Sequence, residues 1–266
     1  MVTREQYIRR QQIIQNRMMK FFVPKVQAAL QHQVKTAIAV IRAKGIAAAQ
    51  GNINGDILNQ HIGGVITELY RTAAKIAFQN YKPNIKAFGD NSSIVDEVIA
   101  FLKRYLLQKV VVPISQTTID QIEQVLQQAQ REGWGVEETV KELEDEDLTK
   151  FRARLIVRTE TVKATNITQL AAADNEDYEM EKMWIAIEDS RTRKSHSHAG
   201  VDGERIPLDQ PYSNGLMYPG DPNGGPEEVC NCRCTQGYFA ARDNNGRLIP
   251  KKQKGITILH TLGLAA

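Results

Sequence analysis

Five side chains that can bind a metal ion or act as nucleophiles lie in two short stretches of this 266-residue chain. All of its cysteines, Cys230, Cys232 and Cys234, occupy alternate positions of VCNCRC, and His196 and His198 lie upstream in DSRTRKSHSHAGVDG. Thiolates and imidazoles are the ligands that zinc takes in closed tetrahedral sites. Zinc is therefore the cofactor to expect if these residues form a site.

The C-x-C spacing sets a condition on such a site. Alternate residues face the same side only where the backbone is extended. In an extended segment, Cys232 and Cys234 share an ion with His196, and either His198 or Cys230 completes the shell. The alternative is that the thiols are small buried apolar groups and the histidines are hydrogen-bonded polar residues.

Charged residues surround the cysteine and histidine stretches. Asp189, Arg191, Arg193, Asp202 and Arg233 can form carboxylate–guanidinium pairs, because the planar fork of Arg matches a carboxylate. The sequence around them is rich in Gly, Pro, Asp and Asn, which leaves few apolar residues for a core. We therefore expect a polar network that fixes loop geometry.

An enzyme is the main alternative to a structural site. Nearby arginines lower a thiol pKa, so a Cys–His nucleophile pair is conceivable, as is a histidine–metal nuclease. Three alternating cysteines, however, differ from a single activated nucleophile, and the chain has no P-loop, G-x-G-x-x-G, H-E-x-x-H or G-x-S-x-G motif. We expect no catalytic residues, with a metal- or thiol-dependent, nuclease-like enzyme as the rival.

Helices must position these stretches, because apolar residues recur at helical spacing through the first two thirds of the chain. Pro24 is expected to kink or split the first helical segment, and Pro113 to close the third. Thr118 and Gln121 have capping-box spacing, and Gly133 is placed to end the helix that they begin. The expected helical segments are 7–49, 56–80, 93–112, 118–132, 137–144 and 149–173.

The C-terminal third has a different texture. KMWIAIED (182–189) alternates like a strand, ERIPL (204–208) is a hairpin partner for it, and the rest is rich in turn residues. The predicted fold class is mainly α, with a helical N-terminal region followed by a small α+β module with a β-hairpin and long turn-rich loops. The expected parts are 1–112 (basic and helical), 113–240 (helical in 115–175 and α+β in 180–240) and a tail, 241–266.

Charge is unevenly distributed along the chain. Residues 1–50 hold nine Lys or Arg against one acid, whereas 132–147 are strongly acidic. The basic stretch predicts proximity to nucleic acid, with solvated helix faces as the alternative. No membrane span or secretory signal is apparent, so a cytosol-like compartment with reduced thiols is expected. The residues expected near nucleic acid are Arg4, Arg9, Arg10, Arg17 and Lys20.

The order of several short motifs resembles a known family. RTE (158–160), Trp184, DSRTRKSH (189–196), DG (202–203), YPGDP (218–222) and NCRC (231–234) are together similar to the head morphogenesis domain of tailed bacteriophages, the Mu F-like minor head protein family. The resemblance covers roughly residues 115–240. The family's characteristic positions fall on Arg158, Thr159, Glu160, Trp184, Asp189, Arg191, Arg193, His196, Asp202, Gly203, Asp221, Cys232, Arg233 and Cys234.

The resemblance implies a structural virion protein of several copies per head that acts in head assembly and in DNA packaging or delivery. Its implied partners are the portal protein, a capsid or scaffolding protein and packaged double-stranded DNA, which it binds without sequence preference. No contact with a membrane is implied in the assembled state. Its implied location is the capsid interior near the portal, with the host cytoplasm during assembly. The family positions favour His196, Cys232 and Cys234 as the core of a metal site, leave its fourth ligand open, and add Arg158, Glu160 and Trp184 to the structural network.

Overall fold

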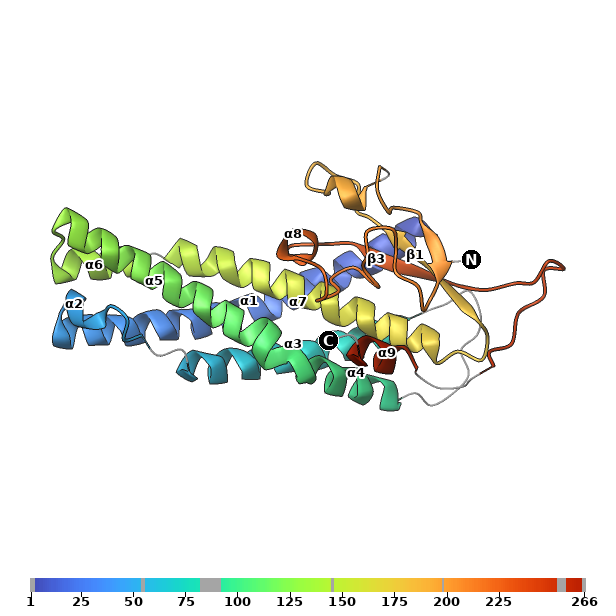
Figure 1. Ribbon diagram of the computed structural model, residues 1–266, viewed down its shortest axis with the longest axis horizontal. Coiled ribbons are helices and arrows are strands. Elements are labelled where there is room, and N and C mark those ends of the chain that lie inside the picture. Colours follow the sequence, from blue (N-terminus) through green and yellow to red (C-terminus); the bar gives the residue numbers. More distant parts are fainter. Residues whose placement is uncertain are drawn as a thin grey trace. The chain divides into compact units, whose positions relative to one another are not determined.

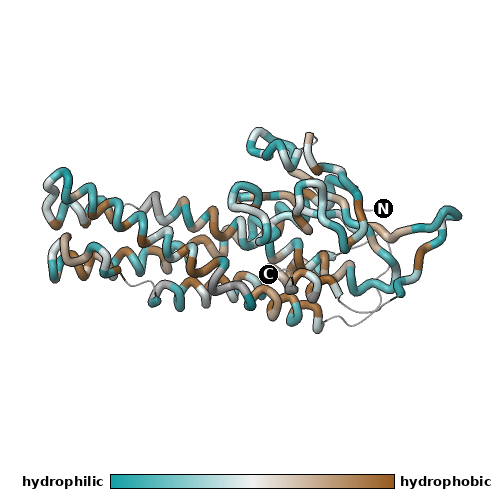
Figure 2. Tube along the Cα trace, in the orientation of Figure 1, coloured by the Kyte–Doolittle hydropathy of each residue, from teal (hydrophilic) through white to brown (hydrophobic). Residues whose placement is uncertain are grey.

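A computed structural model describes residues 3–53, 56–81, 92–144, 146–197, 199–252 and 257–264. Long helices dominate, and a small antiparallel sheet lies in the C-terminal third (Figure 1). Hydrophilic and hydrophobic stretches alternate along the helices (Figure 2), as expected where one face of each helix is buried. The expected fold class, mainly α with a C-terminal α+β module, is confirmed.

The chain divides into two compact units. Unit 1 contains Met1–Met19, Leu69–Leu102 and Arg158–Ala266, and unit 2 contains Lys20–Glu68 and Lys103–Val157. The boundary falls inside helices rather than in loops, since α1, α3, α4 and α7 each contribute residues to both units. The expected domain limits at residues 112 and 240 stay predictions. These helices span Arg4–Lys44 (α1), Asp56–Asn80 (α3), Ser92–Tyr105 (α4) and Glu146–Asp174 (α7).

Unit 2 is built on an apolar cluster between helical segments. Its shorter helices are α2 (Ile46–Ala49), α5 (Val112–Glu132) and α6 (Val136–Leu143). Gly133 ends α5 with a left-handed backbone (φ 72°), as expected from its position. The buried members of the cluster are Val34, Ala37, Ile38, Ile41, Ala49, Ile122, Leu126, Val140 and Leu143.

Pro24 was expected to kink or split the first helix; the split is wrong, and the kink stays a prediction. Helix α1 runs through Pro24 as one element. A proline inside a helix costs one backbone hydrogen bond and crowds the preceding turn. Phe22 and Val26, on either side of it, are fully buried, and burying two such side chains stabilises the helix by several kcal/mol, roughly 1.5–3 kcal/mol each. Packing therefore outweighs the local penalty.

Pro113 does not close a helix either. Helix α4 passes through a π-helical turn, η1 (Leu106–Val111), directly into α5, and Pro113 lies in the first turn of α5. A first-turn residue has no helical acceptor for its N–H group, so proline is tolerated there. The expectation of a helix end at 112 is therefore wrong because the chain changes helix type there.

The capping-box prediction for Thr118 and Gln121 is also wrong, because both residues lie inside α5. Thr118 Oγ1 donates to the Ile114 carbonyl at 2.9 Å. The Arg152 guanidinium of α7 donates to Thr118 Oγ1 at 2.6 Å and to Gln121 Oε1 at 3.1 Å. The two side chains therefore accept hydrogen bonds from α7 and do not cap the start of α5.

Unit 1 contains the sheet. Its strands are β1 (Met180–Ile185), β2 (Arg205–Pro207) and β3 (Thr235–Ala240). The order is β2-β1-β3 with antiparallel pairing throughout, and Lys182 lies opposite both Ile206 and Tyr238. The expected pairing of the 182–189 and 204–208 segments is confirmed, although 19 residues (186–204) separate the two strands. Strand β3, which follows the last cysteine directly, was not predicted.

The first turns of α1 are fastened to the C-terminal part of unit 1 along one helix face. Tyr7 Oη lies 3.5 Å from the Tyr238 carbonyl, and Gln11 Nε2 donates to Thr165 Oγ1 at 3.1 Å. Gln15 Nε2 donates to the Arg233 carbonyl at 3.3 Å. Positions 7, 11 and 15 recur every four residues, so one stripe of α1 makes all three contacts.

The tail docks on the chain itself. The Asp174 carboxylate accepts hydrogen bonds from the backbone N–H groups of Thr257 (2.5 Å) and Ile258 (2.7 Å) and pairs with Lys251 Nζ at 2.5 Å. Ile258 begins helix α9 (Ile258–Leu264), so Asp174 caps that helix from a distant part of the sequence.

In the described part of the chain, no helix has the length and apolar character to cross a bilayer.

The turn that contains Gly220 approaches the backbone of α7. Gly220 has φ 88°, and a Cβ placed on it lies 3.1 Å from Lys163 Cα and N. Gly215, in the same loop, has φ 81° but no atom within 4 Å of such a Cβ. Both positions therefore favour glycine because of their backbone conformation, but only Gly220 also lacks room for a side chain.

We predict that Gly220→Ala lowers the free energy of unfolding more than Gly215→Ala does. Gly215→Ala adds only the left-handed strain of about 1 kcal/mol. Gly220→Ala adds a clash with main-chain atoms, for a total of about 2–4 kcal/mol. Urea unfolding followed by circular dichroism measures both, and equal losses would contradict a close approach at Gly220.

Candidate functional site

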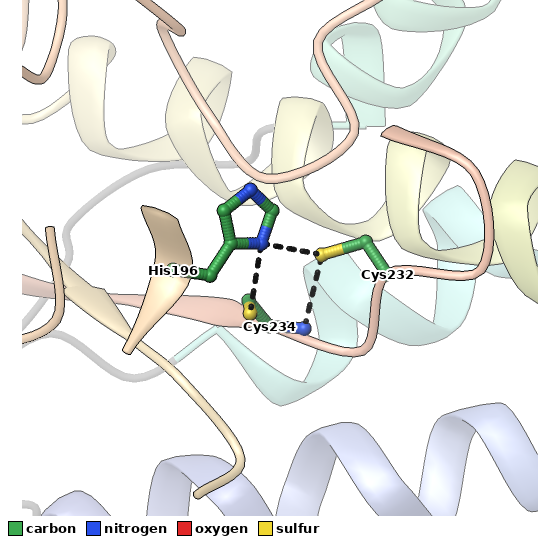
Figure 3. Close-up of side chains that lie close together, drawn as sticks. All are labelled: His196, Cys232 and Cys234. Carbon is green, nitrogen blue, oxygen red and sulfur yellow. Dashed lines mark hydrogen bonds between the residues drawn. The ribbon is translucent and has the colours of Figure 1, made fainter. Parts of the chain in front are cut away.

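His196, Cys232 and Cys234 meet in the interior of unit 1 (Figure 3). His196 Nδ1 lies 3.7 Å from the sulfur of each cysteine, and the three ligand atoms lie within 4.8 Å of one another. The histidine ends a short 3₁₀ turn, η2 (Lys194–His196), whereas the cysteines precede β3. All three residues are at most 4% exposed.

The two sulfurs lie on the same side of the segment that precedes β3, both facing His196. Cys232 and Cys234 are buried, whereas Arg233 between them faces the opposite way and contacts Asp189. Asn231, just before them, has a left-handed backbone (φ 61°), and its N–H donates to Thr159 Oγ1 at 2.8 Å. This turn lies between the end of α8 (Pro226–Val229) and the segment that carries Cys232 and Cys234.

Glu228 holds the other nitrogen of the imidazole. His196 Nε2 lies 2.7 Å from Glu228 Oε2, and Ser195 Oγ donates to both carboxylate oxygens at 3.0 and 3.1 Å. Sequence reasoning missed Glu228, because a single acid in PEEV carries no signal of its own. Only the helical turn α8 brings it to the histidine.

Aromatic rings enclose the cluster. The Trp184 indole of β1 packs edge-on against the His196 ring, with centroids 4.9 Å apart, and against Tyr212 at 5.1 Å. Trp184 is fully buried. This packing fixes the plane of the imidazole and keeps water from one side of it.

The two thiols are electronically unequal. Hydrogen bonding from the Cys234 side chain lowers the pKa of Cys232, although burial opposes the change. The same contact, together with burial, raises the pKa of Cys234 well above its usual value. Cys232 is thus the thiol that ionises first, and a thiolate is the form that binds metals.

Asp189 and Arg233 form a bidentate ion pair on the other side of the segment. Arg233 Nη1 and Nη2 donate to the two carboxylate oxygens at 2.5 and 2.6 Å. Arg191 makes a longer contact with Asp189, 3.3 Å, from a largely exposed side chain. Hydrogen bonding from Arg233 holds the pKa of Asp189 well below its usual range, so the pair is ionic at neutral pH.

The other network residues make contacts elsewhere in unit 1. The Asp202 carboxylate accepts from the Ala186 N–H at 2.7 Å and from Arg4 at 2.6 and 2.7 Å. Glu160 pairs with Lys163 at 2.7 Å, with both side chains buried. The remaining contacts are those of Arg158 with Asn231 Oδ1, Arg193 with the Cys230 carbonyl and Tyr70 with Glu160.

Of the two candidates for a fourth metal ligand, Cys230 lies outside the cluster and His198 is not described by the structure. Cys230 is exposed and, among the residues that the structure describes, the metal-ligating cluster holds only His196, Cys232 and Cys234. His198 lies outside the described residues, so its role stays a prediction. A small pocket beside the cluster is lined by the three cluster residues together with Arg191, Arg193 and Asn231.

The basic residues of α1 also differ from one another. Arg4 pairs with buried Asp202, so its guanidinium contributes to the fold. Arg10 is partly buried, whereas Arg9, Arg17 and Lys20 are exposed. Of the five residues expected near nucleic acid, these last three have exposed side chains.

We predict that Arg233→Ala lowers the free energy of unfolding by about 1–2 kcal/mol, because it removes two charge-assisted hydrogen bonds, whereas Arg191→Ala costs less than about 0.5 kcal/mol. The effect of Arg233→Ala is present above pH ~3.9, the ordinary pKa of aspartate, and is lost as Asp189 becomes protonated below it. Denaturant titrations at several pH values check both. Equal effects of the two substitutions would contradict a stabilising Asp189–Arg233 pair.

Comparison with known proteins identifies the segment that carries this site. Residues 120–237 match the family described as phage Mu protein F-like. No similar protein was found among curated proteins, and no solved structure matches the chain. The matched segment begins within α5 and ends within β3, so it includes the His–Cys cluster, Glu228 and the Asp189–Arg233 pair. Residues 120–237 of the chain are therefore similar to the phage Mu protein F-like family.

Proposed function

We propose that this protein is a minor head protein of a tailed bacteriophage, present in several copies per head inside the capsid near the portal. It acts in head assembly and in DNA packaging or delivery. The observation that carries the proposal is the family match over 120–237, since that family comprises phage head-related structural proteins. Portal protein and a capsid or scaffolding protein are the partners.

The geometry of the cluster supports a structural role over an enzymatic one. His196, Cys232 and Cys234 are buried, and both imidazole nitrogens face groups of the protein itself, Glu228 at Nε2 and the two cysteines at Nδ1. A general base or nucleophile needs to reach the substrate atom on which it acts. These side chains instead connect η2, α8 and the segment before β3, which is the placement of a fold-stabilising cluster.

The surface of α1 supports contact with packaged DNA. Arg9, Arg17 and Lys20 are exposed and lie at spacings of eight and eleven residues, which places them toward one side of a helix. Exposed cations of this kind bind phosphates without reading base sequence. The DNA partner is therefore double-stranded DNA of any sequence.

The decisive test is the composition of purified phage particles. We predict that mass spectrometry of heads finds this protein at a few copies per portal ring and that it co-purifies with the portal after the shell is disrupted. Arg233→Ala is expected to reduce incorporation by weakening the fold, whereas Arg191→Ala leaves incorporation unchanged. Heads that assemble fully without the protein, with the protein remaining in the host cytoplasm, would overturn the proposal.

A second prediction concerns DNA. Replacing Arg9, Arg17 and Lys20 by Gln is expected to reduce the slope of log affinity against log salt by about 2–3, since each neutralised phosphate contributes about 0.9. A charge-matched control replaces the exposed Lys103, Arg104 and Lys109 by Gln. Fluorescence anisotropy with short duplexes of two unrelated sequences measures the slopes. Equal slopes for the two triple variants would exclude α1 as the DNA-binding surface.

A further inference from the structure

The three cluster atoms already have the spacing of ligands around one ion. Zinc lies about 2.3 Å from a thiolate sulfur and about 2.0–2.1 Å from an imidazole nitrogen, so the edge of a zinc tetrahedron between N and S is about 3.5–3.6 Å. His196 Nδ1 lies 3.7 Å from Cys232 Sγ and 3.7 Å from Cys234 Sγ. Both distances therefore lie within about 0.2 Å of such an edge.

Hydrogen bonding alone accounts poorly for this arrangement. An imidazole ring nitrogen carries either one proton or one in-plane lone pair, so Nδ1 can make one good hydrogen bond, and here two sulfurs are equally distant. The two sulfurs lie within 4.8 Å of one another, and the Cys234 N–H donates to Cys232 Sγ at 3.4 Å. An ion at the centre satisfies all three atoms at once.

Glu228 supplies the support that a metal-binding histidine needs. Its carboxylate lies 2.7 Å from His196 Nε2 and is held by Ser195 Oγ. A carboxylate at one ring nitrogen keeps the proton there and leaves the other nitrogen free as a ligand. The contact therefore selects the tautomer in which Nδ1 faces the two thiols with its lone pair.

The surroundings provide space for a fourth donor. Trp184 covers the imidazole, and the small pocket lined by Arg193 and Asn231 lies beside the cluster. A water molecule in that pocket can complete a tetrahedral shell. Two thiolates and one imidazole favour zinc over the harder magnesium and calcium ions, which take oxygen ligands.

We propose that His196 Nδ1, Cys232 Sγ and Cys234 Sγ hold a structural zinc ion, that Glu228 is the positioning residue for His196, and that Cys230 is not a ligand. The ion joins the η2 turn to the segment before β3, across more than thirty residues of sequence with little regular structure. The proposal does not depend on the function in phage heads, because it concerns only the contents of the folded chain.

The first experiment is elemental analysis of the full chain, expressed without added metal and purified without chelators. We expect about one zinc per chain. Cys232→Ser, Cys234→Ser and His196→Asn are each expected to lose most of it, whereas Cys230→Ser, the matched control, keeps it. Loss of zinc from Cys230→Ser to the same extent would overturn the assigned ligand set.

A second measurement covers the case in which ligand variants do not fold. Wild-type protein treated with a chelator is expected to melt at a lower temperature and to recover when zinc is returned. Cobalt in place of zinc is expected to give a thiolate-to-metal charge-transfer band and the strong visible bands of a tetrahedral site. Chelator-treated protein that melts unchanged, and gives no such bands with cobalt, would refute the proposal.

Glu228→Gln separates positioning from ligation. Gln can still accept a hydrogen bond but lacks the charge that keeps the imidazole oriented, so we expect zinc content near that of wild type but affinity reduced about 10–100-fold in chelator competition. Glu227→Gln, its exposed neighbour in α8, is the control and is expected to leave affinity unchanged. Equal affinities of the Glu228→Gln variant and wild type would remove Glu228 from the site.

Discussion

The alternation of side chains in the segment before β3 is the constraint on which unit 1 depends. The sulfurs of Cys232 and Cys234 face the interior there, while Arg233 between them faces Asp189. The main chain of the same segment accepts from the α1 side chain of Gln15 and from Asn166 of α7. A shift of one residue would exchange the two faces and separate all of these partners at once.

Polar contacts have this importance because the apolar cluster around Trp184 is small and lies among loops. A buried lysine, Lys182, contacts one of its members. Lys182 Nζ donates to the Met217 carbonyl at 2.8 Å and lies 5.1 Å from the centre of the Tyr212 ring, and burial lowers its pKa to about 7. Asp221 contributes by accepting from the Met217 and Asn223 N–H groups, so the turn-rich loop is ordered by hydrogen bonds more than by hydrophobic burial.

Sequence patterns predicted where helices occur better than they predicted the residues at which helices begin and end. Apolar periodicity located most helices because burial of one face determines it, but Pro24 and Pro113 misled because tertiary packing and a change of helix type decide their effect locally. The cluster of His196 with two cysteines followed from residue types and spacing. Glu228 and the pairing of Arg4 with Asp202 did not, since a lone charge gives no sign in the sequence of the partner that the fold will bring to it.

The fastening of the first turns of α1 has a consequence for biosynthesis. Tyr7 and Gln15 find their partners at Tyr238 and Arg233, more than two hundred positions later in the chain. A ribosome therefore releases the beginning of the protein long before those partners exist, and the earliest helix must wait with its contact stripe uncovered. Completion of unit 1 is thus one of the last events of translation, when newly made chains are also near one another and able to exchange this helix.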